Sequence, residues 1–215
     1  MSWILIANPK GGCGKTTLAV QLASLLAESA RVVGLYDADP QASSLDWASR
    51  RDPRVAPVNA QAVTAPSDIR RDDDDYCIID TASAKSPQCW LDALCPGDVW
   101  LIPVQASPVD LAALASLPAP VLPQGVMAGV VASRVNPQTL NWRLLQRAVA
   151  DLPWPLFGWL RDTQQYLHAM QQGMGLFDAP GLASVRDRMQ WHSLLEAIFP
   201  DQPALSQLPY QIAEP

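Results

Sequence analysis

The chain has 215 residues, 49% of them hydrophobic, and carries a net charge of −6 at neutral pH. This length suffices for one domain with a full hydrophobic core, and the acidic balance argues against a protein that constitutively coats nucleic acid. No run approaches the ~20 apolar residues that cross a bilayer, and no basic and apolar leader opens the sequence, so we expect a cytoplasmic protein.

Four cysteines lack the C-x-x-C spacing of a metal or redox site, namely Cys13, Cys77, Cys89 and Cys95. We therefore expect reduced thiols, with neither disulfides nor zinc. The two histidines, His168 and His192, are each flanked by apolar residues in a helical pattern, which indicates packing rather than catalysis.

Short apolar runs alternate with helical patterns along most of the chain. We expect strands at 3–7, 31–36, 76–79, 99–104 and 126–132, and helices near 16–28, 43–51, 86–95, 108–117, 138–150, 163–172 and 181–198. Apolar runs this short and this uninterrupted are typical of strands buried in a parallel sheet. The pattern predicts a doubly wound α/β domain over residues 1–199, with a mostly parallel sheet and helices on both faces. Four prolines predict an irregular tail over 200–215.

A glycine-rich segment follows the first expected strand, with the sequence Lys10-Gly11-Gly12-Cys13-Gly14-Lys15-Thr16-Thr17. Glycines let the backbone turn tightly and direct consecutive N–H groups at an anion. Lys15 supplies a charge for the outer phosphates of a nucleotide, and the Thr16 hydroxyl is a ligand for Mg²⁺. The helix that begins here adds its dipole and its free N–H groups. The order of strand, glycine loop and helix therefore predicts a phosphate-binding loop.

Acidic residues end two of the expected strands, at the edge where open α/β sheets bind ligands. Asp37 ends the second strand, and Asp39 points to the same side if the backbone stays extended. Asp80 ends the apolar run 76–79, a Walker B pattern in which a carboxylate orients the Mg²⁺ shell. A lone aspartate after a strand often caps a helix instead. Three carboxylates beside a phosphate loop favour the magnesium site.

The motifs together resemble the ParA/MinD family of deviant Walker ATPases. The resemblance rests on K-G-G-x-G-K-T-T at 10–17, on D-x-D-P-Q at 37–41, and on the apolar strand that ends in Asp80 and Thr81. Residues 101–111 resemble the strand and loop of small ParA-type proteins, and 158–177 resemble their late helical region. The length is similar to that of members that act in plasmid partition or carboxysome positioning. The resemblance implies a P-loop ATPase that uses ATP and Mg²⁺ and forms a homodimer on ATP.

The same resemblance implies roles for individual residues. Lys10, which the ordinary phosphate loop lacks, would reach the phosphates of the partner subunit, as an arginine finger does. Asp39 would position the attacking water. Asp37 and Asp80 would hold the Mg²⁺ environment together with Thr16.

Three features depart from the family pattern. Ala82 stands where relatives often have a proline after D-T, and Ser133 stands where an asparagine often precedes an arginine near the base pocket. The C-terminal tail carries no basic amphipathic helix, which is the membrane-targeting device of the MinD branch. We therefore expect no binding to membranes.

Positive charge is concentrated in one region of the chain. Residues 130–190 hold six arginines against four aspartates, and these arginines are Arg134, Arg143, Arg147, Arg161, Arg186 and Arg188. They are either solvated helix faces or a phosphate-binding patch. From the resemblance we expect the ATP-bound dimer to bind DNA without sequence preference, on the nucleoid. A small cargo-linked partner would then stimulate hydrolysis, the cargo being a plasmid or a protein body such as a carboxysome.

Two other functions remain open. One is an ATP-dependent biosynthetic enzyme on the same loop, such as a dethiobiotin-synthetase-like or cobyrinate-type ligase. The other is a MinD-like spatial regulator that does not use DNA. Lys10 suits a dimeric switch better than a biosynthetic enzyme.

Overall fold

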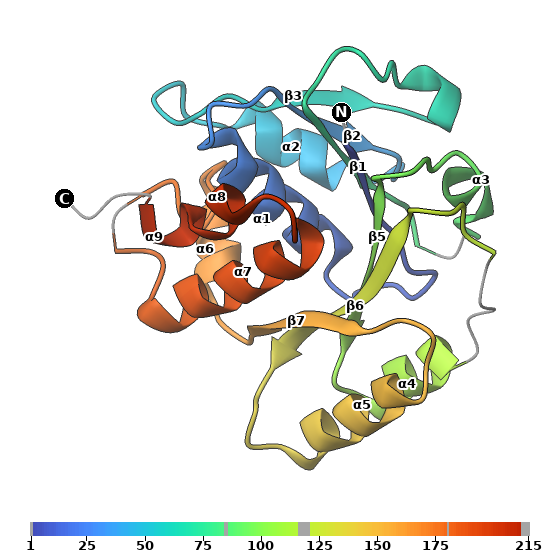
Figure 1. Ribbon diagram of the computed structural model, residues 1–215. Coiled ribbons are helices and arrows are strands. Elements are labelled where there is room, and N and C mark those ends of the chain that lie inside the picture. Colours follow the sequence, from blue (N-terminus) through green and yellow to red (C-terminus); the bar gives the residue numbers. More distant parts are fainter. Residues whose placement is uncertain (1, 84–85, 116–120, 180, 212–215) are drawn as a thin grey trace.

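A parallel sheet forms the centre of the protein in this computed structural model, which describes residues 2–83, 86–115, 121–179 and 181–211 (Figure 1). Within these ranges seven strands pair in the order β3-β2-β4-β1-β5-β6-β7, and every pair is parallel. The strands are β1 (Ser2–Ile6), β2 (Val33–Asp37), β3 (Asn59–Ala62), β4 (Tyr76–Asp80), β5 (Val99–Gln105), β6 (Met127–Val135) and β7 (Leu156–Arg161).

Helices cover both faces of the sheet, which confirms the predicted doubly wound fold (Figure 1). One face carries α1 (Lys15–Ala27), α2 (Ser43–Ser49), α6 (Gln165–Gln171), α7 (Val185–Ile198), α8 (Pro203–Ser206) and α9 (Leu208–Gln211). The other carries α3 (Gln88–Leu91), α4 (Pro108–Ala115) and α5 (Leu140–Ala150), and the 3₁₀ turn η1 (Pro66–Asp68) precedes β4. None of the described helices is long and apolar enough to cross a membrane.

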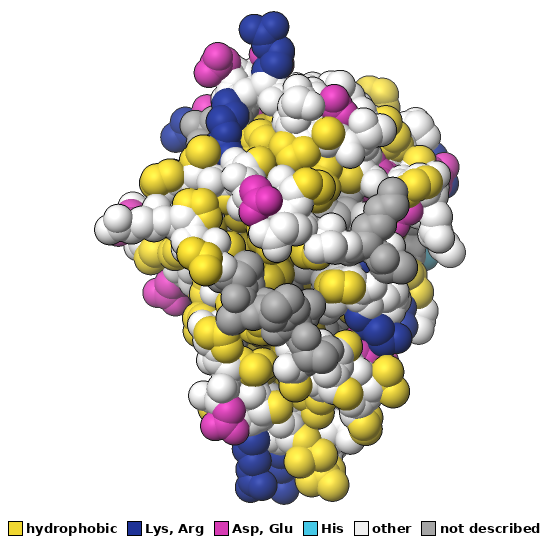
Figure 2. Space-filling model, turned by 90° about the vertical axis from the view of Figure 1, so that its right-hand side faces the viewer, with side chains coloured by type: hydrophobic (Ala, Val, Ile, Leu, Met, Phe, Trp, Pro, Cys, Tyr) yellow, Lys and Arg dark blue, Asp and Glu magenta, His cyan; other side chains and the backbone are white. Residues whose placement is uncertain are grey.

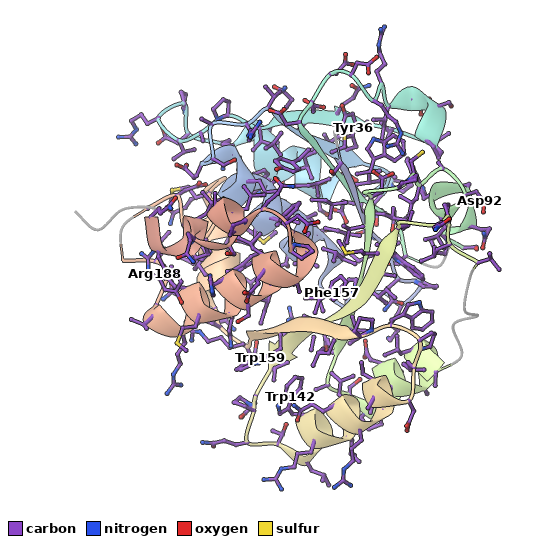
Figure 3. The ribbon with its side chains drawn as sticks, viewed as in Figure 1. Tyr36, Asp92, Trp142, Phe157, Trp159 and Arg188 are labelled. Carbon is purple, nitrogen blue, oxygen red and sulfur yellow. The ribbon has the colours of Figure 1, made fainter. Side chains whose placement is uncertain are left out.

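Alternate residues of each central strand supply two separate hydrophobic cores. In β1, Ile4 and Ile6 pack under α1, whereas Trp3 and Leu5 face the opposite layer. This alternation follows from the two-residue period of a strand. Aromatic contacts fix the outer helices, as where Trp142 of α5 faces Trp159 of β7 with ring centroids 5.7 Å apart (Figure 3).

Two strands were not predicted, and both lie at the edges of the sheet. β3 has the sequence Asn-Ala-Gln-Ala and is largely exposed, so it lacks the apolar run of a buried strand. β7 follows a proline-rich approach and contains Gly158, which weakens a strand signal. Residues 158–161, expected to lead into a late helical region, therefore belong to the sheet. The expected end of one helix at 117 lies outside the described residues.

Residues 203–211 form two short helices, α8 and α9, where the prolines predicted an irregular tail. Pro203 occupies the first turn of α8, where its missing N–H costs no helical hydrogen bond. Leu205 and Leu208 are buried in the core beside α7 and α1. His192 of α7 contacts this segment, since its Nδ1 lies 2.6 Å from the Ser206 carbonyl oxygen. Residues 203–211 thus contribute to the hydrophobic core.

Candidate nucleotide-binding site

The glycine-rich loop connects the carboxyl end of β1 to α1, as the sequence predicted. Gly12 and Gly14 have φ angles of 74° and 96°, which residues with a side chain rarely adopt. Helix α1 begins at Lys15, and no side chain caps its N-terminus. Its first N–H groups and its dipole therefore remain available to an anion lying against the loop.

Lys15 lies at the centre of this loop and is 6% exposed. Its ammonium donates hydrogen bonds to the carbonyl oxygens of Asn8 (3.1 Å) and Lys10 (3.0 Å), and to Ser83 Oγ (2.8 Å). Ser83 follows Asp80 in the loop after β4. Lys15 thus connects the phosphate loop to the loop that follows Asp80.

The hydrogen bonds of Lys10 involve its backbone rather than its side chain. Its N–H donates to Asn8 Oδ1 at 3.0 Å, and its carbonyl oxygen accepts from Lys15 and from the Cys13 thiol. Its ammonium forms no ion pair with any described residue. Within the described part of this subunit the Lys10 charge is therefore not neutralised by an ion pair. The predicted role toward a partner subunit requires such an available charge.

Asp80 is buried beside the loop, and no described residue gives its carboxylate a well-formed hydrogen bond. It is 1% exposed, and neither carboxylate oxygen accepts a hydrogen bond from a described residue. The pKa of Asp80 is raised to about 7, chiefly by burial; the charges of Asp37 and Asp39 contribute to this rise, while the Thr16 hydroxyl and the Lys15 charge oppose it. A buried carboxylate with free lone pairs and a neighbouring hydroxyl is a donor set that suits Mg²⁺. Asp80 and Thr16 therefore fit the expected metal.

Asp37 lies next to Asp80 across the β2–β4 pair, as expected. Its oxygens are already used. One accepts from the Asp39 N–H at 2.9 Å, and the other accepts from the N–H and hydroxyl of Ser44 and from the N–H of Leu45. Asp37 thus anchors the start of α2, and its place in a magnesium shell remains a prediction.

Asp39 begins the turn that precedes α2. Its Oδ1 accepts the N–H of Gln41 at 2.9 Å, and the residue is partly exposed at the carboxyl edge of the sheet. Its role in positioning a water molecule stays a prediction.

Two side chains that sequence analysis left without a site role contact the phosphate loop directly. Gln105 Nε2 donates to the carbonyl oxygen of Gly12 at 2.6 Å, and Ser133 Oγ donates to that of Cys13 at 2.6 Å. Gln105 lies in a stretch that resembles the family, and Ser133 was a departure from it. Neither the family resemblance around Gln105 nor the departure at Ser133 could reveal a contact to the phosphate loop, because that contact depends on how β5 and β6 pair.

A cavity of about 330 Å³ adjoins the loop at Gly14. Helix α1 contributes Thr17 and Leu18 to its wall, and β6 contributes Ser133 and Arg134. Residues 160–164, at the end of β7 and beyond, complete one side. Its size is typical of a small-molecule site.

Two of the six arginines of residues 130–190 bond to other parts of the chain. Arg161 donates two hydrogen bonds of 2.7 and 2.9 Å to Asp187, whose side chain is fully buried. Burial raises the pKa of Asp187, but Arg161 and Ser184 lower it more, so the net shift is downward. Arg188 donates to the Pro209 carbonyl oxygen and points toward the C-terminal helices (Figure 3). Of the two alternatives left open for these arginines, the phosphate-binding patch is therefore not supported for Arg161, whose guanidinium is already paired with Asp187.

Arg143 and Arg147 remain exposed, one turn apart on α5. In Figure 2 basic side chains gather at the lower end of the molecule, over α5, beside exposed hydrophobic side chains. No acidic residue occurs within α5. This surface, Arg143 and Arg147 on α5, is called the α5 face below.

Residues 4–177 match the family described as the CobQ/CobB/MinD/ParA nucleotide binding domain. The chain belongs to this family of P-loop nucleotide-binding proteins. It is 32% identical over 185 residues to "Maintenance of carboxysome distribution protein A" of Gloeobacter kilaueensis, covering 83% of this chain and 85% of that protein.

Solved structures of distant relatives share the fold. A variant of McdA from Cyanothece in complex with ATP is 19% identical, with a TM-score of 0.61, covering all of this chain and 98% of that one. The pNOB8 ParA bound to nonspecific DNA is 17% identical, with a TM-score of 0.56, covering 98% of this chain and 97% of that one. The fold class predicted from the sequence is confirmed.

Proposed function

We propose that this protein is an ATP-dependent dimerising switch that positions a cargo in the cell, hydrolysing ATP to ADP and phosphate. The observation that carries the proposal is that Asp80, a buried carboxylate at the end of β4, and Lys10, a lysine on the adjoining phosphate loop, both lack an ion-pair partner among the described residues. The first suits Mg²⁺–nucleotide, and the second suits a phosphate chain in the partner subunit.

ATP would place its phosphates along residues 10–17 and its base in the adjoining cavity. Lys15 would exchange its contact with Ser83 for the outer phosphates, which frees the loop after β4 to change position. Asp80 and Thr16 would hold Mg²⁺, which neutralises charge on the phosphates. Lys10 of each subunit would complete the site of the other, so that ATP joins the dimer and its hydrolysis releases it.

Two substitutions test the assignment of these roles. Lys15→Ala should abolish nucleotide binding, because the only other cation of residues 10–17, Lys10, is proposed to serve the partner subunit and would not replace its charge. Asp39→Ala should retain Mg–ATP while hydrolysis stops, so that a long-lived dimer accumulates. Calorimetry and phosphate release measure both. An Asp39→Ala protein that cannot bind ATP would place Asp39 in the metal shell instead and overturn its role with water.

The dimer would bind DNA without sequence preference through the α5 face, and so act in the cytoplasm on the nucleoid. Support comes from the two exposed arginines, from the absence of acidic residues on α5, and from the related ParA that binds nonspecific DNA. Two copies of the surface in a dimer would double the phosphate contacts. Binding would then require ATP and would weaken steeply with salt, by ~0.9 logarithmic units per phosphate neutralised.

The DNA proposal has a matched control within the chain. Arg143→Ala with Arg147→Ala should weaken ATP-dependent DNA binding, whereas Arg31→Ala with Arg70→Ala removes the same charge from exposed positions in other segments. Equal binding with ADP, or equal loss in both double variants, would contradict the α5 face. No DNA binding at low salt with saturating ATP would favour a MinD-like regulator that does not use DNA.

The cargo would be a plasmid or a protein body, with a small cargo-linked protein that stimulates hydrolysis. The name of the Gloeobacter relative supports a carboxysome-like body. ATPase rates should rise only when the partner and DNA are both supplied. Rates that rise instead with a small organic acid or amine would favour the biosynthetic enzyme.

A further inference from the structure

The phosphate loop rests on two polar side chains that project from neighbouring strands. Gln105 ends β5 and Ser133 lies on β6, and the two are direct partners in the register of the parallel pair. Each donates one short hydrogen bond of 2.6 Å to the loop, Gln105 to the Gly12 carbonyl oxygen and Ser133 to the Cys13 carbonyl oxygen. We call Gln105 and Ser133 the loop platform.

These bonds determine which way two peptide planes face. In a trans peptide the C=O and N–H groups point in opposite directions. Holding the carbonyls of Gly12 and Cys13 toward the strands therefore directs the N–H groups of Cys13 and Gly14 to the other side of the loop. Such aligned N–H groups are what a phosphate-binding loop offers to an anion.

Ser133 is committed to this task by its surroundings. A hydroxyl has a single proton, which Ser133 directs chiefly to Cys13 because its other acceptor, the Val104 carbonyl oxygen, is farther away at 3.2 Å. The loop packs closely here, since a Cβ added to Gly14 would lie 3.3 Å from Ser133 Oγ. Although Ser133 also borders the cavity, its donor is used by the loop backbone.

We propose that Gln105 and Ser133 are positioning residues that set the affinity of the loop for the phosphate chain, independently of the base. The inference rests on the proposed function, because it assumes that the loop binds ATP. It predicts equal losses for any ligand that carries the triphosphate. Residues of the cavity wall should instead distinguish ATP from a triphosphate without a nucleoside.

The experiment measures binding of Mg–ATP and of Mg–tripolyphosphate by calorimetry. Gln105→Met keeps the side-chain length but removes the donor, and Ser133→Ala removes the hydroxyl. Each should weaken both ligands by about tenfold, the size of one lost hydrogen bond to a carbonyl. The matched control is Gln164→Met on the cavity wall, which should leave tripolyphosphate binding unchanged. Thermal melts confirm that every variant is folded.

A pH profile separates positioning from general damage. Gln105→Glu places a carboxylate against the Gly12 carbonyl, so binding relative to the wild type at the same pH should be lost at pH 8 and partly regained near pH 4, below the ordinary pKa of ~4.3 for glutamate, where the carboxyl is protonated and donates again. Gln105→Met should show no such recovery. If Gln105→Met and Ser133→Ala bind both ligands as tightly as the wild type, or if they lose affinity for ATP only, the inference is overturned. The proposed function would still stand. A wild-type protein that binds neither ligand would overturn the proposed function as well.

Discussion

Two buried carboxylates in this protein have opposite surroundings. Asp178, with a side chain that is 0% exposed, accepts hydrogen bonds from two nitrogens of Arg51, from Ser24 Oγ and from the Gly175 N–H. Asp80, 1% exposed, accepts none from the described residues. Both lie near α1, but Asp178 joins three segments of the chain, whereas Asp80 faces the phosphate loop.

The difference distinguishes a carboxylate that stabilises the fold, Asp178, from a carboxylate that is available to a ligand, Asp80. A buried charge is tolerated when its donors are present in the folded chain. At Asp80 no described residue supplies a well-formed donor, and this is why we propose a cation held with phosphates as its partner. Arg51→Ala removes donors of Asp178, and Asp80→Asn removes the buried charge at Asp80.

The largest effect should follow the loss of Arg51, whose side chain is 6% exposed and also stacks on Trp47. Arg51→Ala leaves Asp178 charged and buried, so we expect a loss of about 3 to 5 kcal/mol in unfolding free energy. The neighbouring Arg50→Ala is the control, because its pair with Asp46 is exposed and should change stability by less than about 0.5 kcal/mol. Urea unfolding measures both. Equal changes in the two variants would mean that the buried pair has no special weight.

A smaller loss is expected for Arg161→Ala. Its partner Asp187 is buried, but Arg161 itself is 28% exposed, so water can partly replace it. We expect a loss of about 2 kcal/mol, discounted from the range for a fully buried pair. Because the pKa of Asp187 is lowered in the folded protein, this contribution is present at neutral pH and is lost on acidification. Unfolding at pH 7 and pH 3 tests this; identical losses at both would contradict the assignment.

Asp80→Asn should have the opposite sign in the ligand-free protein. The pKa of Asp80 is about 7 in the fold but near 4 in an unfolded chain, so the native state binds the extra proton between these values. Wild-type stability should therefore fall as pH rises from about 4 to 7, and Asp80→Asn should flatten this dependence. At pH 8 we expect a gain of about 1 to 2 kcal/mol, together with a higher Mg²⁺ requirement for ATP binding. Parallel pH curves for the two proteins would contradict the unpaired carboxylate.

The smallest effect on stability is expected on the α5 face. Arg143 and Arg147 are exposed and form no ion pair among the described residues, so replacing both with alanine should change unfolding by less than about 0.5 kcal/mol. A larger loss would place these arginines with Arg161, as structural residues. Weaker DNA binding by the Arg143→Ala, Arg147→Ala variant could then not be attributed to lost contacts between these arginines and DNA.

The fold class and the phosphate loop could be predicted from local sequence, because a glycine loop between a strand and a helix is defined by adjacent residues. The two edge strands were missed, since neither β3 nor β7 shows the apolar run of a buried strand. The partners Arg51 with Asp178, and Gln105 with Gly12, lie 127 and 93 residues apart. Such pairs depend on strand order and register, which a single sequence does not specify.

The central claim is that Lys10 acts on the nucleotide of a second subunit. Sedimentation velocity with Mg–ATP and with Mg–ADP, for the wild type and for Lys10→Ala, tests it most directly. We predict a wild-type dimer with ATP alone, and a Lys10→Ala protein that binds ATP with near-normal affinity but stays monomeric or fails to hydrolyse it. A wild type that stays monomeric with ATP, or a Lys10→Ala protein that loses ATP binding as completely as Lys15→Ala, would contradict the account.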